Sequence, residues 1–340
     1  MPKGYYLIQN GPADSAFDLR ELPSREINSS EVRIAVEGFG LNFADVMARL
    51  GQYRECPPLP TIIGYEAVGT VTEVGAAVRH VKVGERVLAF TRFGGYAEEV
   101  ITDHRGVVPI PDTWSLGWAT ALATQYATAW YSATYITQLH PGEKVLIQAA
   151  AGGVGTALVQ IARHKSCIIY GTAGSAAKID YLRQLGVQHP INYRTTNFYD
   201  YIQQDLQGGR LDVVFDPIGG KVSRQGFKLL SSGGRMVCYG AASLTGKNNL
   251  FAKLRFALQF GFFHPIQLMM RSKSIIGVNM LKVGDYRPEA LQTVMQEVVE
   301  ASKSGLLQEQ KTTEYPADQL ATAHTALEKR QTMGKVAMKW

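Results

Sequence analysis

The first 110 residues carry short apolar runs that are broken by glycines and charged residues. Examples are "EVRIAVEGFGLN" (31–42), "AVGTVTEVG" (67–75) and "ERVLAF" (85–90). Valine-rich runs of this length, bounded by turn residues, are typical of half-buried strands. The pattern predicts an antiparallel, β-rich domain that folds over on itself as a barrel.

From about residue 122 the spacing of the apolar residues changes, and the patterns of buried strands alternate with those of helices. The helix "SAAKIDYLRQLG" (175–186) is one of the latter. The predicted strands are 144–150, 167–173, 189–193, 211–220, 234–242 and 273–280. Alternation of this kind predicts an α/β domain with a doubly wound parallel sheet, a Rossmann fold, over 122–282. The C-terminal helix and strand are expected to return to the first domain, which then comprises 1–121 and 283–340.

Composition narrows the class of protein. Apolar residues make up 46% and charged residues 19% of the chain, and 35 basic against 29 acidic residues give a net charge of +6. This excess is read as spread along the chain, so no nucleic-acid partner is expected. The three cysteines form no CxxC pair, and neither an apolar 18-residue run nor a signal core occurs. We therefore expect a cytoplasmic protein.

The stretch "QAAAGGVGTALVQIA" (148–162) has the form of a nucleotide-binding turn between a strand and a helix. Ala150 stands in the first glycine place of GxGxxG, which alanine fits if its φ is negative. Gly152 lets the backbone approach a pyrophosphate, and Gly155 lets the helix pack close to the strand. The expected pyrophosphate-binding residues are Ala151, Gly152, Gly153, Val154 and Gly155.

The second strand of this domain indicates which nucleotide binds. NAD-selective sites place an acidic residue about 20 positions after the turn, on the ribose 2′-hydroxyl. Here the region offers Thr172, Ser175 and Lys178, and no carboxylate before Asp180. Taken alone, Lys178 would be an ordinary exposed helix lysine. Together with the missing acid and with Tyr193 at the end of the third strand, it predicts NADP(H).

Several motifs carry a family resemblance. "GLNFADVMARLGQY" (40–53), "PTIIGYEAVGTVTEVG" (60–75) and "AAAGGVG" together resemble the medium-chain dehydrogenase/reductase superfamily, and "GTAGSAAK" and "INYR" its zinc-free quinone oxidoreductase branch. "PPLP", "DPIGG" and "LLSSGGRMVCYGAASLTG" are similar to the vesicle amine transport protein homologues. The resemblance implies a GroES-like catalytic domain and a Rossmann domain with the active site in the cleft between them. It also implies a homodimer that pairs through the strand at 274–280.

Metal ligands are missing where zinc-dependent members of that superfamily have them. "GLNFAD" contains no cysteine, Tyr65 precedes Glu66 in the place of a histidine, and no four-cysteine lobe occurs near residue 100. We therefore expect no metal. Glu66 is interpreted as a structural partner of a basic residue.

The resemblance places Asn42 and Tyr53 at the catalytic centre, where each can donate a hydrogen bond. Asp45 has two open interpretations: a contact to the nicotinamide end of the cofactor, or a helix cap. Met47 replaces a second tyrosine and makes the pocket more apolar. Further cofactor contacts implied by the resemblance are Thr128, Gly240, Ala241, Val278, Asn279 and Lys335.

The segment 246–274 is long, aromatic and basic. It is interpreted as a lid, a dimer contact or a peripheral membrane patch. Two functions follow. The first is an NADPH-dependent, zinc-independent reductase of quinones or other conjugated carbonyls. The alternative is a nucleotide-binding, membrane-associated interaction protein on the same fold with weak or no turnover.

Overall fold

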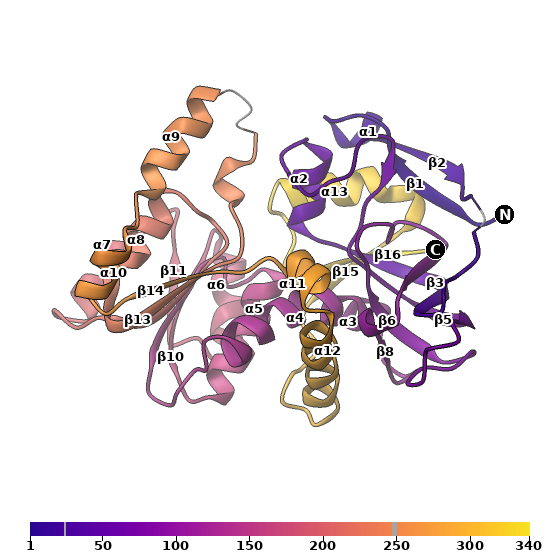
Figure 1. Cartoon of the computed structure of the whole chain (residues 1–340). Coiled ribbons are helices and arrows are strands. Elements are labelled where there is room, and N and C mark those ends of the chain that lie inside the picture. Colours follow the sequence, from indigo (N-terminus) through magenta and orange to yellow (C-terminus); the bar gives the residue numbers. More distant parts are fainter. Residues whose placement is uncertain (24, 247–249) are drawn as a thin grey trace. The chain divides into compact units, whose positions relative to one another are not determined.

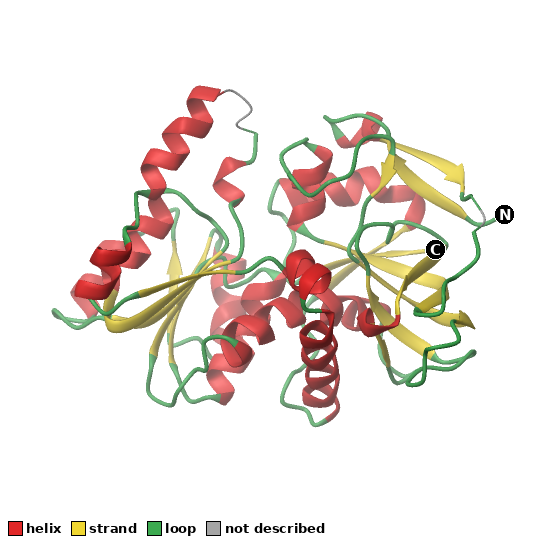
Figure 2. Cartoon of the chain, in the orientation of Figure 1, coloured by secondary structure: helices red, strands yellow, loops and turns green. Residues whose placement is uncertain are grey.

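The chain folds into two compact units in a computed structural model that describes residues 1–23, 25–246 and 250–340. The first unit comprises 1–127, 280–305 and 309–340, and the second comprises 128–279 with 306–308. The sequence-based boundaries were placed at 121 and 283. Figure 1 follows the chain by colour, and Figure 2 marks its helices and strands.

The first unit is built on antiparallel strands, as its sequence pattern predicts. A small sheet has the order β2-β1-β4, and a larger one has the order β15-β16-β3-β5-β6-β8, with β7 also paired to β3. Apolar residues of β3, β5 and β6, among them Val32, Val71 and Val87, lie in one buried core cluster. The strands are β1 (Lys3–Leu7), β2 (Phe17–Glu21), β3 (Glu31–Leu41), β4 (Thr61–Ile62), β5 (Glu66–Val74), β6 (Arg86–Phe90), β7 (Glu99–Asp103), β8 (Val107–Pro109), β15 (Thr312–Pro316) and β16 (Lys335–Lys339).

The C-terminal segment completes the larger sheet of this unit. β16 pairs antiparallel with β3, so that Val336 lies opposite Leu41. Its helices are α1 (Ala13–Ala16), α2 (Phe43–Arg49), α3 (Leu116–Ala121), α11 (Met280–Tyr286), α12 (Pro288–Lys303) and α13 (Leu320–Glu328), with short helical turns at His104–Gly106, Leu122–Tyr126 and Ala317–Gln319.

The second unit contains a parallel sheet in the order β11-β10-β9-β12-β13-β14. In chain order this is 3-2-1-4-5-6, the strand order of the Rossmann fold. The strands are β9 (Lys144–Ile147), β10 (Ile168–Ala173), β11 (His189–Asn192), β12 (Leu211–Asp216), β13 (Leu230–Cys238) and β14 (Ser274–Gly277). Each predicted strand is present, and most end two to four residues early, where a turn begins.

Helices flank this sheet, and one hydrophobic core cluster extends from Leu146 on β9 to Met236 on β13. They are α4 (Ala127–Trp130), α5 (Gly153–His164), α6 (Ala176–Gln184), α7 (Phe198–Asp205), α8 (Lys221–Leu229), α9 (Leu250–Phe260) and α10 (Pro265–Met270), with short turns at Tyr131–Tyr135 and Ala242–Leu244. None of the helices in the described part of the chain has the length and apolar character that crossing a bilayer requires.

Candidate functional site

The glycine-rich turn lies between β9 and α5, as its sequence predicts. Gly152 is the N-cap residue of α5, and the helix starts at Gly153. The first amides of a helix have no partner within it, so those of Gly153, Val154 and Gly155 are available to an anion. Ala151 precedes them in the same turn. This is the geometry that a pyrophosphate needs.

The alanines of the turn take different conformations. Ala150 does not have positive φ, which fits its place in the glycine pattern, whereas the preceding Ala149 has φ of 53°. Gly155 has no room for a side chain, because an added Cβ would lie 2.7 Å from the Cα of Ala150. The helix therefore packs against the strand through a glycine at this point, as expected of a dinucleotide-binding turn.

The structure corrects the role of Thr172. Its hydroxyl is buried, donates to Oε1 of Gln148 at 2.6 Å and accepts from the Ala149 amide at 3.1 Å. A hydroxyl held in this way does not face a 2′-phosphate. Thr172 instead ties the nucleotide turn to the neighbouring strand and so acts as a positioning residue.

The other residues that are expected to bind the adenosine end of the cofactor, Ser175, Lys178 and Tyr193, lie around the start of α6. We call this place the adenosine corner. Ser175 is the N-cap residue of α6 and accepts from the Lys178 amide. Tyr193 packs against the β10–α6 loop, since a Cβ added to Gly174 would meet its ring carbon at 2.7 Å. Asp180, further along the helix, accepts a hydrogen bond from Arg183 at 2.7 Å. The corner thus contains Ser175, Lys178 and Tyr193 beside a helix N-terminus, and residues of these types suit a phosphate.

Gly240, Ala241, Val278 and Asn279 follow the carboxyl ends of β13 and β14. The Val278 amide donates to the Cys238 carbonyl at 2.9 Å, which continues the sheet beyond β14. A Cβ on Gly240 would lie 2.8 Å from the Pro217 carbonyl oxygen, so the loops after β12 and β13 touch. In a parallel sheet these carboxyl ends form the edge where ligands bind.

Sequence reasoning missed Asp216, which organises that edge. Asp216 is buried at the end of β12, and its carboxylate accepts from the Ile218 amide at 2.7 Å and from the Ser223 hydroxyl. It also accepts from the Gly219 amide. The sequence feature that could have indicated this role is the position of an acidic residue directly before "PIGG". Thr128, by contrast, is buried in α4.

In the first unit, Asn42 and Asp45 lie at the start of α2. The Asn42 amide nitrogen of the backbone donates to Oδ2 of Asp45 at 2.7 Å, as in a capping box. The cap interpretation of Asp45 is therefore confirmed. The side chain of Asn42 is used elsewhere: its Nδ2 donates to Oε1 of Glu66 at 2.8 Å.

Glu66 pairs with Lys335, and both side chains are fully buried. The interpretation of Glu66 as the partner of a basic residue is confirmed. Lys335 Nζ also contacts the Leu41 carbonyl at 3.3 Å and Oδ1 of Asn42 at 3.4 Å. Its ammonium is thus held inside the first unit, which corrects the expectation that it reaches toward the cofactor.

The four residues Asn42, Asp45, Glu66 and Lys335 form what we call the buried polar cluster. Burial raises the pKa of Asp45 to about 8, and the Glu66 carboxylate acts in the same direction, while the Asn42 amide and the Lys335 ammonium oppose it. At neutral pH Asp45 is therefore mainly a neutral acid. Glu66 and Lys335 form the ion pair of the cluster.

Tyr53 and Tyr65 lie beside this cluster. Their rings meet edge to face, with centroids 6.0 Å apart. Burial, with the nearby Glu55 and Asp45, raises the pKa of Tyr53 to about 12, so its hydroxyl remains a hydrogen-bond donor at neutral pH. The Tyr65 hydroxyl is buried without a partner among the described residues. The neighbouring Met47 is also buried.

Because the carboxyl group of Asp45 is buried, we expect the free energy of unfolding to depend on pH. A carboxyl group whose pKa rises on folding stabilises the fold at low pH and loses that contribution as pH rises to the folded pKa. Relative to Asp45→Asn, the free energy of unfolding of the wild type should fall by about 1.4 kcal/mol per pH unit between its unfolded pKa and about 8. Denaturant unfolding of both proteins at a series of pH values measures this. Parallel stability curves would show that Asp45 is ionised in the fold.

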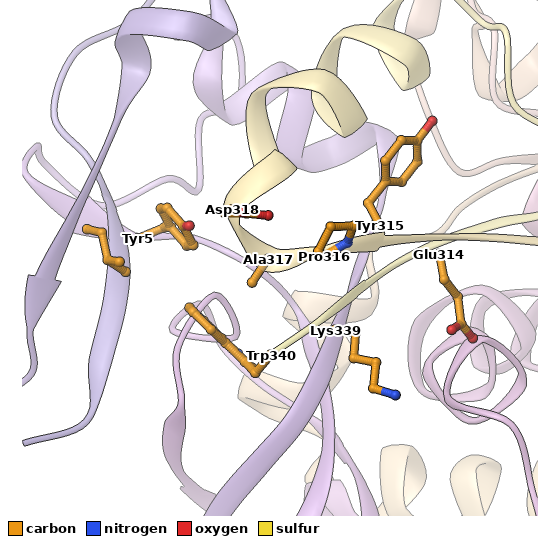
Figure 3. A pocket seen from close by; sticks show the side chains of 9 residues that line it. Tyr5, Glu314, Tyr315, Pro316, Ala317, Asp318, Lys339 and Trp340 are labelled. Carbon is orange, nitrogen blue, oxygen red and sulfur yellow. The ribbon is translucent and has the colours of Figure 1, made fainter.

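A surface pocket of the first unit lies apart from this cluster. Figure 3 shows Tyr5 and Trp340 at its wall, and their rings stack with centroids 5.6 Å apart. None of the predicted site residues lines it. No group of three or more His, Cys, Asp or Glu side chains suited to a metal ion occurs within the described ranges.

Comparison with known proteins agrees with this architecture. The model of the alcohol dehydrogenase GroES-like domain matches residues 28–112, and that of the zinc-binding dehydrogenase matches 153–300. The synaptic vesicle membrane protein VAT-1 homolog of Mus musculus is 34% identical over 311 residues, which are 91% of this chain and 76% of that protein. The homolog of Danio rerio is 33% identical, and the chain spans 64% of its length.

Solved structures extend the likeness over the whole chain. Escherichia coli quinone oxidoreductase complexed with NADPH superposes with a TM-score of 0.85 at 25% identity, covering 99% of this chain and 100% of its own. CurK enoyl reductase superposes with a TM-score of 0.86 at 26% identity, covering 99% of each chain. A Rossmann unit with a nucleotide turn and a GroES-like unit together define a class of oxidoreductases. The chain belongs to the medium-chain dehydrogenase/reductase superfamily, with VAT-1 homologues and quinone oxidoreductases among its relatives.

Proposed function

We propose that the protein is an NADPH-dependent, zinc-independent reductase of quinones or other conjugated carbonyls. The observation that carries the cofactor choice is the adenosine corner, where Ser175 and Lys178 stand at a helix N-terminus and the first carboxylate, Asp180, is paired with Arg183. The relatives named for quinone and enoyl reduction support the substrate class.

The residues of the second unit fit the cofactor. Ala151 to Gly155 would hold the pyrophosphate, Ser175, Lys178 and Tyr193 the phosphorylated ribose, and Gly240, Ala241, Val278 and Asn279 the nicotinamide end. When bound, NADPH supplies a hydride to the electrophilic carbon of the substrate. Asp216 fixes the loop beneath the nicotinamide end through its three bonds.

The first unit would stabilise the negative charge that develops on the substrate oxygen. Asn42 has two N–H groups on its side chain, and only one is given to Glu66. The second N–H and the Tyr53 hydroxyl are offered to the oxygen. The Glu66–Lys335 pair holds the Asn42 amide in one orientation, and Met47 makes the surrounding surface apolar. No metal is required for this chemistry.

An assay with a matched variant tests the proposal. NADPH oxidation should occur with phenanthrenequinone or with alkenals. Tyr53→Phe should lower kcat/KM by about 100–1,000-fold, the range for loss of one oxyanion donor, and should leave NADPH affinity unchanged. Tyr315→Phe, which removes a hydroxyl outside the buried polar cluster, is the control. Absence of oxidation above the blank across the panel would contradict the proposal.

We also propose an oligomeric state and a cellular location for the protein. β14 is an edge strand of its sheet, with its outer side unpaired within the described chain, and it is the strand through which a homodimer would form. We place the enzyme in the cytoplasm. Sedimentation velocity of the purified protein tests the dimer, and a monomer at micromolar concentration would contradict it.

The second candidate function, a membrane-associated nucleotide-binding protein with weak turnover, is favoured by a different observation. The segment 246–274 exposes apolar side chains on α9 and α10. Residues 247–249 of that segment lie outside the described residues. Tight NADPH binding without oxidation of the cofactor by any substrate in the panel would favour this candidate over the reductase.

A further inference from the structure

One stretch of the second unit is free of acidic residues. After Asp216 the next acidic residue is Asp285, and the 68 residues between them contain ten Lys and Arg. With 35 basic and 29 acidic residues in the whole chain, the other 272 residues hold 25 basic against 29 acidic and have a net charge of −4. The positive excess is therefore concentrated here, and the interpretation that it is spread along the chain was wrong.

Three of these charges lie on one side of α8. Lys221, Arg224 and Lys228 of α8 are spaced three and four residues apart, so they point to the same side of the helix, and all three are exposed. Arg224 lies against Gly261, directly after α9. Arg271, after α10, is also exposed. Figure 1 shows α8, α9 and α10 grouped at one side of this unit.

Helix α9 carries apolar residues on two sides. Phe256 packs over Gly219 and Gly220, and Phe260 meets Phe263, which in turn contacts Phe227 of α8. These aromatic contacts attach α9 to the body of the unit. A helix that buries one apolar side in a water-soluble unit normally presents polar residues on the other.

The other side of α9 does not carry the polar residues that this rule predicts. Leu254 and Leu258, four residues apart, are more than half exposed. Phe262 in the following turn is 85% exposed, and Met270 at the end of α10 is 79% exposed. Among the described side chains of this region, the large apolar ones that are exposed are Leu254, Leu258, Phe262, Ile266, Met269 and Met270. Large apolar side chains gathered in this way mark a contact with a partner.

We propose that these exposed apolar residues, together with Lys221, Arg224, Lys228, Arg255 and Arg271, form a docking surface for an anionic lipid bilayer. We call it the α8–α10 surface. Its cations match the phosphate and carboxylate headgroups, and its leucines, methionines and phenylalanine match the acyl boundary below them. This partner is independent of the proposed reductase activity, because no catalytic residue lies on the surface.

Two other partners fit the same surface less well. A second copy would bring like charges together, since the surface has no acidic residue to pair with them. A nucleic acid would satisfy the cations and would leave the aliphatic side chains of Leu254, Met269 and Met270 in water, because stacking on bases needs aromatic rings. A bilayer satisfies both kinds of residue.

Cosedimentation of the full chain with vesicles tests the proposal. The protein should bind vesicles with about 30 mol% phosphatidylserine and not pure phosphatidylcholine, and binding should weaken as salt rises from about 0.05 M to about 0.5 M. Arg255→Gln with Arg271→Gln should reduce partitioning by about 30-fold. Phe262→Ser with Met270→Ser should reduce it by at least about tenfold.

Matched controls in the first unit are Val83→Ser, an exposed apolar residue, and Lys303→Gln, an exposed lysine. Both should bind vesicles as the wild type does. NADPH binding by each variant confirms that the second unit is folded. Failure of the wild type to bind anionic vesicles would overturn the proposal. So would conversion of a dimer to a monomer by Phe262→Ser with Met270→Ser, or binding to an oligonucleotide that these two changes leave intact.

Discussion

Replacing Lys335 by methionine is expected to lower the free energy of unfolding by about 3–5 kcal/mol, the range for removal of one partner of a buried ion pair. The side chains of Lys335 and Glu66 are both fully buried, so the variant leaves a carboxylate in the interior with the Asn42 amide as its remaining partner. Methionine has a similar length and retains the packing of the lysine stem. Urea unfolding followed by circular dichroism measures the change.

Two further variants separate charge from packing. Glu66→Gln combined with Lys335→Met removes both charges and should recover most of the lost stability, because replacing a whole buried pair is often nearly neutral. Lys339→Met, four residues along the same strand but exposed, should cost less than about 0.5 kcal/mol. If Lys335→Met is as mild as Lys339→Met, the ion pair does not hold the buried polar cluster together.

Replacing Lys178 by glutamate should weaken NADPH binding by about 100-fold and change NADH binding by less than about threefold. Loss of a charge-assisted bond to a phosphate accounts for about 1.5–3 kcal/mol, and the new carboxylate adds repulsion of the 2′-phosphate. Since only NADPH carries that phosphate, the effect should be specific to it. Isothermal titration calorimetry with each nucleotide measures both affinities.

A matched charge reversal at another exposed lysine of the same unit controls for the change in net charge. Lys165 lies after α5, at the end of the helix opposite to the nucleotide turn. Lys165→Glu should change the affinity for either nucleotide by less than about threefold, because exposed charges more than about 10 Å apart are largely screened at ordinary salt. Equal losses for NADPH and NADH in Lys178→Glu would mean that the lysine does not contact the 2′-phosphate.

The sequence was most informative where the period of the apolar pattern decides the structure. The change from short strands to alternating strands and helices near residue 122 predicted a sheet whose order is 3-2-1-4-5-6. The glycine turn was predictable for the same reason, since Gly152 and Gly155 have fixed places between a strand and a helix. Strand ends were less accurate, because a turn such as that at Ala149 begins before the apolar run stops.

The roles of single side chains depended on contacts that the sequence does not specify. Thr172 was expected to face the phosphate, but the pleat of β10 turns its hydroxyl toward Gln148. Lys335 was expected to reach the cofactor, but β16 lies beside β3 and brings its ammonium to Glu66, 269 positions earlier in the chain. Such long-range pairings arise only when the sheet assembles. The stretch without acidic residues between Asp216 and Asp285, in contrast, can be found from the sequence alone by counting its charged residues.

The central claim is that the second unit selects NADPH through the 2′-phosphate at its adenosine corner. Calorimetric titration of the wild-type protein with NADPH and with NADH under the same salt conditions tests it most directly. The expected result is that NADPH binds at least about 100-fold more tightly, as a bound phosphate with charge-assisted partners requires. Equal affinities, or tighter binding of NADH, would contradict the account.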